Sequence, residues 1–157
     1  MVERRLRANL AATSSTPAID ISITEYHEAL LEFSRTLIDQ RKYGISTVVA
    51  HMACEIVVER VFASAFETKK ISELQEPVTE LFSGYNLSNP RIRKVYAALT
   101  GDSTIQDEPF WTKFKTSATR RNHIMHKRHI ATKQEAEESL GAASALIAYL
   151  DQKFRTS

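Results

Sequence analysis

Apolar residues recur at intervals of three and four along most of the chain after Pro17, which is the spacing of an amphipathic helix. This spacing predicts a first helix from Ile23 to Lys42 with one buried face. The residues of that face are Ile23, Tyr26, Leu30, Phe33 and Leu37. Gly44 ends the pattern, and Ser46 is the expected N-cap of a second helix, Thr47 to Phe66. Because the second helix is apolar on most sides, we expect it at the centre of the fold.

Prolines and glycines mark the elements in the middle of the chain. A shorter helical piece is expected from Ser72 to Phe82, where Pro77 forces a start or a kink. Residues 86–90 form a predicted loop, and Pro90 fits the first turn of a brief helix that ends before Gly101. This part of the chain therefore supplies one or two short helices.

Two more long helices are predicted in the last third of the chain. Residues 107–109 resemble the acidic, proline-bearing start of a helix that runs to about Ala131. Thr132 and Glu135 match a capping box at the start of the final helix. The pattern as a whole predicts an all-α fold, a helical bundle of four main helices plus one or two short ones. We expect a flexible basic tail over residues 1–20 and a single domain over residues 21–157.

The composition is that of an ordinary globular domain, with 43% apolar and 25% charged residues. The single cysteine, Cys54, excludes an intrachain disulfide and lies in an apolar run, so we interpret it as a core residue. No stretch approaches the ~18–20 apolar residues that span a bilayer, and the first residues lack the apolar region of a secretory signal. A cytoplasmic location without a membrane partner is expected.

Positive charge is concentrated in one stretch. No acidic residue occurs from Thr112 to Gln134, while these 23 positions hold seven Lys or Arg and three His in a chain whose net charge is only +2. A surface helix usually mixes both signs of charge. Guanidinium and imidazole groups suit phosphate chemistry, so this stretch indicates RNA or a nucleotide as the ligand.

Arg121 and Asn122 lie along the apolar stripe that Trp111, Phe114 and Met125 define on a helical wheel. The residues expected to point to solvent are Lys113, Arg120, His123 and Lys127. A guanidinium on the stripe needs an acidic partner, for which Glu55 is a candidate, or a cleft or subunit interface. Residue chemistry alone supports two interpretations equally. In one, Arg121 is a structural residue held in an ion pair and His126 lies at the boundary of the core; in the other, both belong to a functional site.

No metal or other cofactor is expected. His123, His126 and His129 would spread over about 120° of a helix, in a stretch that contains no carboxylate. His51 and Glu55 are spaced i, i+4, which is more often a hydrogen bond within a helix than a set of metal ligands.

The segment Arg121-Asn122-x-x-x-His126 resembles the motif of the HEPN superfamily, helical-bundle domains of RNA-cleaving toxins, antiviral nucleases and RNA-processing factors. The family motif is Arg, four to six residues, then His, with a polar residue directly after the Arg. Here the motif lies late in the penultimate long helix, as in the family, and the resemblance covers about Glu25 to Lys153. One toxin subgroup has a Tyr two residues after the His, where its antitoxin modifies it. This chain has Arg128 there, which argues against that regulation.

The resemblance implies metal-independent endoribonuclease activity that uses the 2′-hydroxyl of the RNA itself. His126 would be the general acid or base, Arg121 would bind the phosphate, Asn122 would orient His126 or the ribose, and Glu55 would hold Arg121. The residues expected to bind the RNA backbone are Lys115, Arg120, Lys127, Arg128 and His129. Because Arg121 and His126 lie about 140° apart on an ideal helix, a homodimer with a composite site is expected.

A toxin–antitoxin, phage-defence or stress role, with an antitoxin or other partner protein, would fit such an enzyme. Two other functions remain open. The first is a non-catalytic HEPN-like module that binds RNA, a nucleotide or a partner protein. The second is a helical adaptor whose basic helix is only a solvated face.

Overall fold

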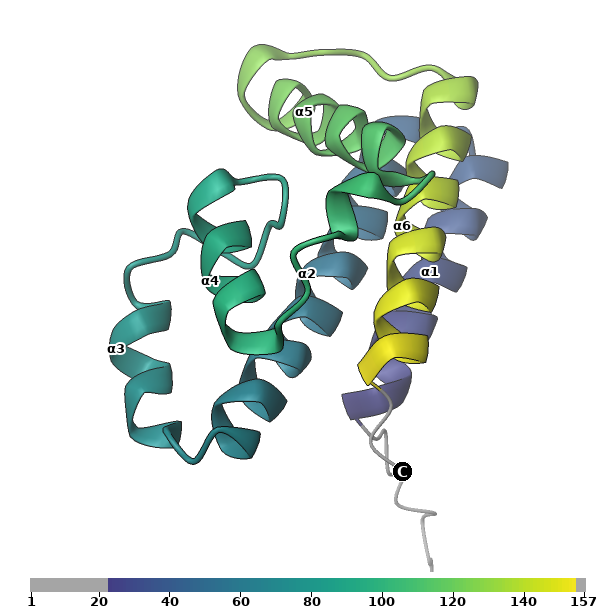
Figure 1. Cartoon of the computed structure of the whole chain (residues 1–157). Helices are drawn as coiled ribbons and strands as arrows, with labels where there is room; N and C mark the ends of the chain where they lie inside the picture. The colour runs from purple at the N-terminus through teal and green to yellow at the C-terminus, as the bar shows by residue number, and fades with distance from the viewer. Residues whose placement is uncertain (1–22, 155–157) are drawn as a thin grey trace, which may run out of the picture.

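The computed structural model describes residues 23–154, with side chains from Tyr26 onward, and this range contains helices and no strand (Figure 1). Its long helices are α1 (Ile23–Asp39), α2 (Tyr43–Thr68), α5 (Trp111–Lys127) and α6 (Lys133–Phe154). Its shorter ones are α3 (Gln75–Thr79) and α4 (Pro90–Thr100), with 3-10 turns at Ser72–Leu74 and Ile105–Asp107. The predicted all-α helical bundle is therefore confirmed. The expected tail, residues 1–20, lies outside the described residues.

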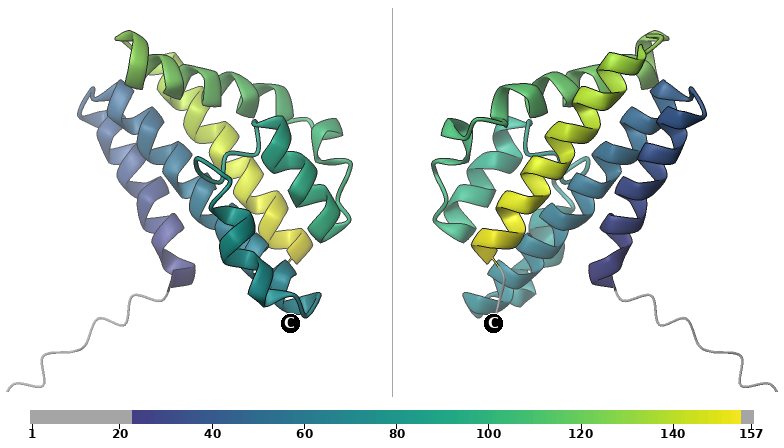
Figure 2. Two further views of the ribbon diagram at one scale, coloured as in Figure 1. Left: turned by 90° about the vertical axis from the view of Figure 1, so that its left-hand side faces the viewer. Right: turned by 90° about the vertical axis from the view of Figure 1, so that its right-hand side faces the viewer.

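Helix α2 is central, as its apolar composition predicts. It contacts α1, α4, α5 and α6, and Figure 2 shows α1, α2 and α6 side by side with α5 crossing one end of this group. The short helices α3 and α4 lie on the side of α2 away from α1 (Figure 1). The fully buried Phe62 of α2 packs against the rings of Tyr85 and Tyr96 on that side. Cys54 is buried in the same core, and burial raises the pKa of its thiol, as expected for a structural residue.

The turn between α1 and α2 lies earlier than the sequence predicts. Helix α1 ends at Asp39, and Arg41 adopts the left-handed conformation (φ 60°). Gly44 therefore lies inside the first turn of α2, and Ser46 is not a cap. Instead Ser46 is buried between the helices, where its hydroxyl donates to the Ser34 carbonyl at 2.9 Å. A small polar pair allows the two helices to pack closely at this point.

The buried face of α1 is also rotated relative to the predicted one. Tyr26 and Phe33 are 47% and 49% exposed, although the apolar spacing places both in the core. His27 and Ser34 are buried in their place. His27 Nε2 lies 3.7 Å from Asp151 Oδ2 of α6, and Ser34 pairs with α2. The prediction is wrong because polar residues with partners on other helices occupy half of the true face.

Helix boundaries in the middle of the chain follow local signals. The segment expected from Ser72 to Phe82 is shorter, a 3-10 turn and then α3, with Pro77 in its first turn. Asn89 caps α4 by accepting a hydrogen bond from the Arg91 amide at 2.9 Å, and Pro90 is the first helical residue. Gly101 ends α4 in the left-handed conformation (φ 78°), as predicted.

Helix α5 is shorter than expected at both ends. Residues 107–109 precede it rather than begin it, because residues 105–107 form a 3-10 turn and the helix starts at Trp111. It ends at Lys127, since Arg128 is left-handed (φ 55°), and His129 is therefore outside the helix. The predicted capping box of α6 is confirmed: the Thr132 amide donates to Glu135 Oε2 at 2.8 Å, and the Glu135 amide donates to Thr132 Oγ1 at 3.2 Å.

No helix between residues 23 and 154 is long and apolar enough to cross a membrane.

Candidate functional site

Arg121 lies on the side of α5 that packs against the rest of the protein, in line with the buried Phe114 and Ala118. This placement confirms that Arg121 follows the buried residues of the apolar stripe. Met125, which the spacing also places on the stripe, is 54% exposed, so that part of the prediction is wrong. Arg121 Nη1 donates to Asn122 Oδ1 at 3.1 Å. Arg121 Nε is buried and has no hydrogen-bond partner among the described residues. An unpartnered charged donor in a protein interior is costly. Because Nε itself is closed off from solvent, other atoms of the Arg121 side chain line the neighbouring pocket.

Arg121 and Asn122 line a pocket of about 340 Å³ together with Glu55 of α2. The opposite wall is the segment between α3 and α4, from which Ser83, Gly84, Asn86, Ser88 and Asn89 line the pocket. Burial raises the pKa of Glu55, and the positive charge of Arg121 lowers it. The pocket thus holds one guanidinium, one carboxylate and a set of amides and hydroxyls.

Glu55 does not pair directly with Arg121. No ion pair within 4.0 Å joins Arg121 to a carboxylate of the described residues. The two charges share the pocket and interact across it, as the opposing effect of Arg121 on the Glu55 pKa indicates. An ion pair in which Glu55 holds Arg121 is therefore not formed, while the expectation that Glu55 tunes the site stays a prediction.

His51 is a buried neighbour of Glu55 that does not line the pocket. It is only 2% exposed, its ring stacks on Phe114 at 6.0 Å between centroids, and its Nε2 lies 3.7 Å from Glu55 Oε1. Burial and the nearby Arg121 charge lower the pKa of His51 to about 4, so the ring is neutral at neutral pH. His51 is thus an uncharged spacer behind Glu55 and Arg121.

His126 lies apart from this pocket. It is exposed on the last turn of α5 and does not line the pocket of Arg121. Because α5 is helical throughout this stretch, the two side chains leave it about 140° apart. Asn122 is bonded to Arg121 rather than to His126. A single chain therefore brings together Arg121, Asn122 and Glu55 but leaves His126 outside.

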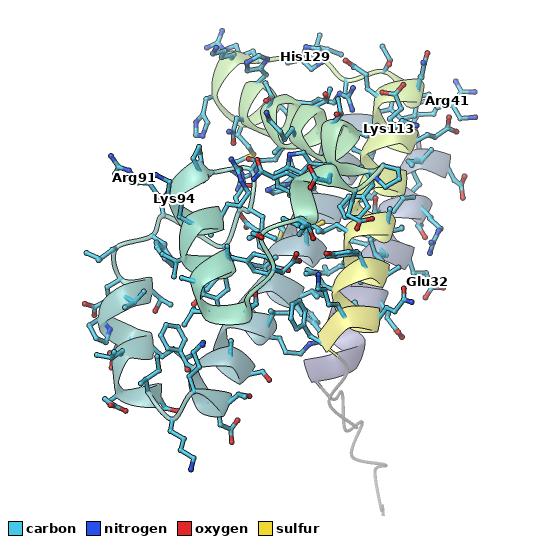
Figure 3. All side chains as sticks on the ribbon, viewed as in Figure 1. Glu32, Arg41, Arg91, Lys94, Lys113 and His129 are labelled. Carbon is cyan, nitrogen blue, oxygen red and sulfur yellow. The ribbon has the colours of Figure 1, made fainter. Side chains whose placement is uncertain are left out.

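The basic residues of the stretch divide into two groups. Arg120, expected to point to solvent, is instead turned onto α6: its side chain is 9% exposed and forms ion pairs with Glu135 and Glu138 at 3.5 and 3.1 Å. That expectation is wrong because acids of α6 attract the guanidinium. His129 lies 3.1 Å from the Glu135 carboxylate, beyond the end of α5 (Figure 3).

Lys115, Lys127 and Arg128 keep exposed charges, and none of them forms an ion pair within the described range. Lys115 lines a second pocket of about 490 Å³ with His123 and His129. Lys127 Nζ lies 3.4 Å from His123 Nε2. These side chains remain candidates for binding an RNA backbone, whereas Arg120 is engaged within the fold.

Sequence reasoning missed the wall formed by residues 83–89. Its composition, Ser-Gly-Tyr-Asn-Leu-Ser-Asn, is a signal of a polar loop, but nothing local connects it to Glu55 or Arg121. Among residues 23–154, no group of three or more His, Cys, Asp or Glu side chains could hold a metal ion.

Comparison with known proteins finds no matching family model, no similar curated protein and no similar solved structure. The resemblance to the HEPN superfamily therefore stays a prediction that rests on the motif and its helical context.

Proposed function

We propose that the protein is a metal-independent endoribonuclease of the HEPN type. The observation that carries the proposal is the half-buried side chain of Arg121, which lines a polar pocket and forms no ion pair with a carboxylate of the described residues. A planar cation held in this way suits the negative charge that develops on a phosphodiester during cleavage. The exposed Lys115, Lys127 and Arg128 supply a sequence-independent attraction for the RNA backbone.

The proposed reaction is a transesterification within the RNA. The 2′-hydroxyl gives its proton to a base, its oxygen bonds to the adjacent phosphorus, and the bond from phosphorus to the 5′-oxygen breaks as that oxygen takes a proton. The products are a 2′,3′-cyclic phosphate and a 5′-hydroxyl, and DNA is not cleaved because it lacks the nucleophile. His126 transfers a proton, since histidine is the side chain that most often acts as a general acid or base. Arg121 binds the phosphate oxygens.

A homodimer is the second part of the proposal, because one chain does not aim His126 at the pocket of its own Arg121. Large apolar side chains are exposed on three helices, namely Tyr26 and Phe33 of α1, Ile45 and Met52 of α2, and Met125 of α5. Burial of such side chains stabilises association. In the proposed dimer, the His126 of a second copy would have to reach the pocket.

A non-catalytic module that binds RNA or a nucleotide is the second candidate. The separation of His126 from the pocket favours it, because the pocket alone binds an anion without a proton-transfer group near neutral pH. A toxin or defence role belongs to the catalytic proposal only, and an antitoxin or partner protein would then restrain the enzyme.

The test is RNA cleavage in excess EDTA by wild type, Arg121→Ala and His126→Ala, with the exposed Arg35→Ala as control. We expect cleavage by wild type and Arg35→Ala only. Mixing Arg121→Ala with His126→Ala chains and allowing subunit exchange should restore part of the activity, because one composite site per mixed dimer is intact. Equal cleavage by all proteins would reject the assignment of Arg121 and His126. Salt-sensitive RNA binding without cleavage would support the binding module instead.

A further inference from the structure

The wall of the Arg121 pocket that residues 83–89 form is built rigidly. Leu87 is fully buried and anchors the segment in the core. Arg93 of α4 donates to the carbonyls of Leu87 and Ser88 at 3.1 and 3.2 Å. Gly84 adopts φ 134°, and an added Cβ there would lie 3.3 Å from Glu55 Oε1. The segment is thus fixed in a close approach to Glu55 that glycine makes possible.

The two asparagines of this wall present hydrogen-bond donors. Asn86 Oδ1 accepts from the Ser88 amide at 2.9 Å, and Asn89 Oδ1 accepts from the Arg91 amide at 2.9 Å. Both side-chain oxygens are therefore engaged by the backbone, which also fixes which end of each amide faces outward. The Nδ2 groups of Asn86 and Asn89 have no hydrogen-bond partner among the described residues.

The opposite wall also presents donors. Arg121 lines this wall with its side chain, although its Nε is closed off from solvent. Asn122 Oδ1 accepts from Arg121 Nη1, which leaves Asn122 Nδ2 without a partner among the described residues. Donors on both walls match a ligand rich in acceptors, and a phosphate group is the most acceptor-rich group in RNA. The pocket volume, about 340 Å³, is at the small end for ligand sites and fits one nucleotide rather than a duplex.

We infer that the segment 83–89 is the substrate-binding wall of the site, where the Nδ2 groups of Asn86 and Asn89 bind the phosphate of a single-stranded RNA nucleotide opposite Arg121. Glu55, the one carboxylate among the residues that line the pocket, binds a hydroxyl of the sugar. This inference rests on the proposed function and extends it, because it assigns substrate contacts to an element outside the Arg-x4-His motif. A phosphate between these walls is held from two sides.

The substitutions Asn86→Asp and Asn89→Asp isolate these donors. Aspartate keeps the oxygen that the Ser88 or Arg91 amide requires and is as good a helix N-cap as asparagine, so the loop and α4 stay folded. It replaces the Nδ2 donor by a charged oxygen that repels phosphate. Gln106→Glu, exposed in the 3-10 turn after α4, is the control for an added negative charge.

The probes are the four nucleoside 3′-phosphates and the corresponding nucleosides, titrated calorimetrically at low salt with the full-length proteins. Wild type and Gln106→Glu should bind the phosphates and not the nucleosides. Each Asn→Asp variant should bind them at least about tenfold more weakly, the loss expected for a hydrogen bond to a charged group. Its circular dichroism spectrum should match that of wild type.

Equal binding by wild type and the Asn→Asp variants would overturn the inference, as would the absence of nucleotide binding by wild type. The same proteins in the EDTA cleavage assay separate the two proposals. If both Asn→Asp variants still cleave RNA, the substrate-binding role of residues 83–89 is wrong, and the nuclease proposal is unaffected. If wild type binds nucleotides but cleaves no RNA, and the variants lose this binding, the substrate-binding role is supported and the catalytic proposal is wrong.

Discussion

The buried His51 should make the fold sensitive to mild acid. In the native state burial and Arg121 lower the pKa of His51 to about 4, whereas an unfolded histidine titrates near 6.5. Protonation of the unfolded chain is therefore favoured as the pH falls. The stability due to the neutral ring is fully present above pH ~6.5 and is lost as the pH falls toward ~4.

The size of the effect follows from the same two pKa values. Each unit of difference is worth about 1.4 kcal/mol, so complete titration removes about 3 kcal/mol. At pH ~5 most of this, about 2 kcal/mol, is already lost relative to pH ~7. Asp102 adds nothing to the loss of stability between pH 7 and pH 5. Burial raises its pKa, but hydrogen bonds from Tyr96, Lys153 and Tyr149 outweigh this effect and hold the pKa at about 2. The pKa of Glu55 is raised, which stabilises the fold on acidification and opposes the loss.

The assay is urea unfolding at pH 7 and pH 5, at one protein concentration, followed by circular dichroism. Wild type should lose free energy of unfolding on acidification. His51→Gln should be less stable than wild type at pH 7, because it loses the stack on Phe114, but should lose about 2 kcal/mol less on acidification. His27→Gln should also lose less free energy of unfolding than wild type on acidification, because burial lowers the pKa of this second histidine as well. Equal acid losses in wild type and His51→Gln would refute the reasoning.

Three further substitutions test local contacts that stabilise the fold. Gly84→Ala should lower the melting temperature, because a backbone at φ 134° strains alanine by roughly 1–3 kcal/mol, whereas Gly141→Ala in open space on α6 should raise it. Asp102→Ala should lower the free energy of unfolding in urea by about 3 kcal/mol, because the hydroxyls of two buried or half-buried tyrosines lose their acceptor. Asp107→Ala, at an exposed position, should lower it little. Equal losses in the two variants would contradict this reasoning. Thr132→Ala should cost about 1 kcal/mol, measured in the same way, and an unchanged midpoint would show that the capping box contributes nothing.

Much of the secondary structure could be predicted because its signals are local. Pro90 and Gly101 mark the ends of α4, and Thr132 with Glu135 marks the start of α6, through hydrogen bonds between residues two to four apart. The position of Arg121 on the apolar stripe of α5 also follows from helical periodicity alone. Each of these depends on geometry within one helix or turn.

Tertiary packing decided which side chains meet. The buried face of α1 includes His27 and Ser34 because partners on α6 and α2 satisfy these polar groups. The spacing of hydrophobic residues carries no information about such partners. Arg120 turned from solvent to the acids of α6 for the same reason. Asn86 and Arg121 line one pocket only because α4 and α5 both pack on α2. By itself the sequence determined the helices and the motif, since these depend on neighbours along the chain, while the composition of the pocket depends on three segments separated by about thirty positions each.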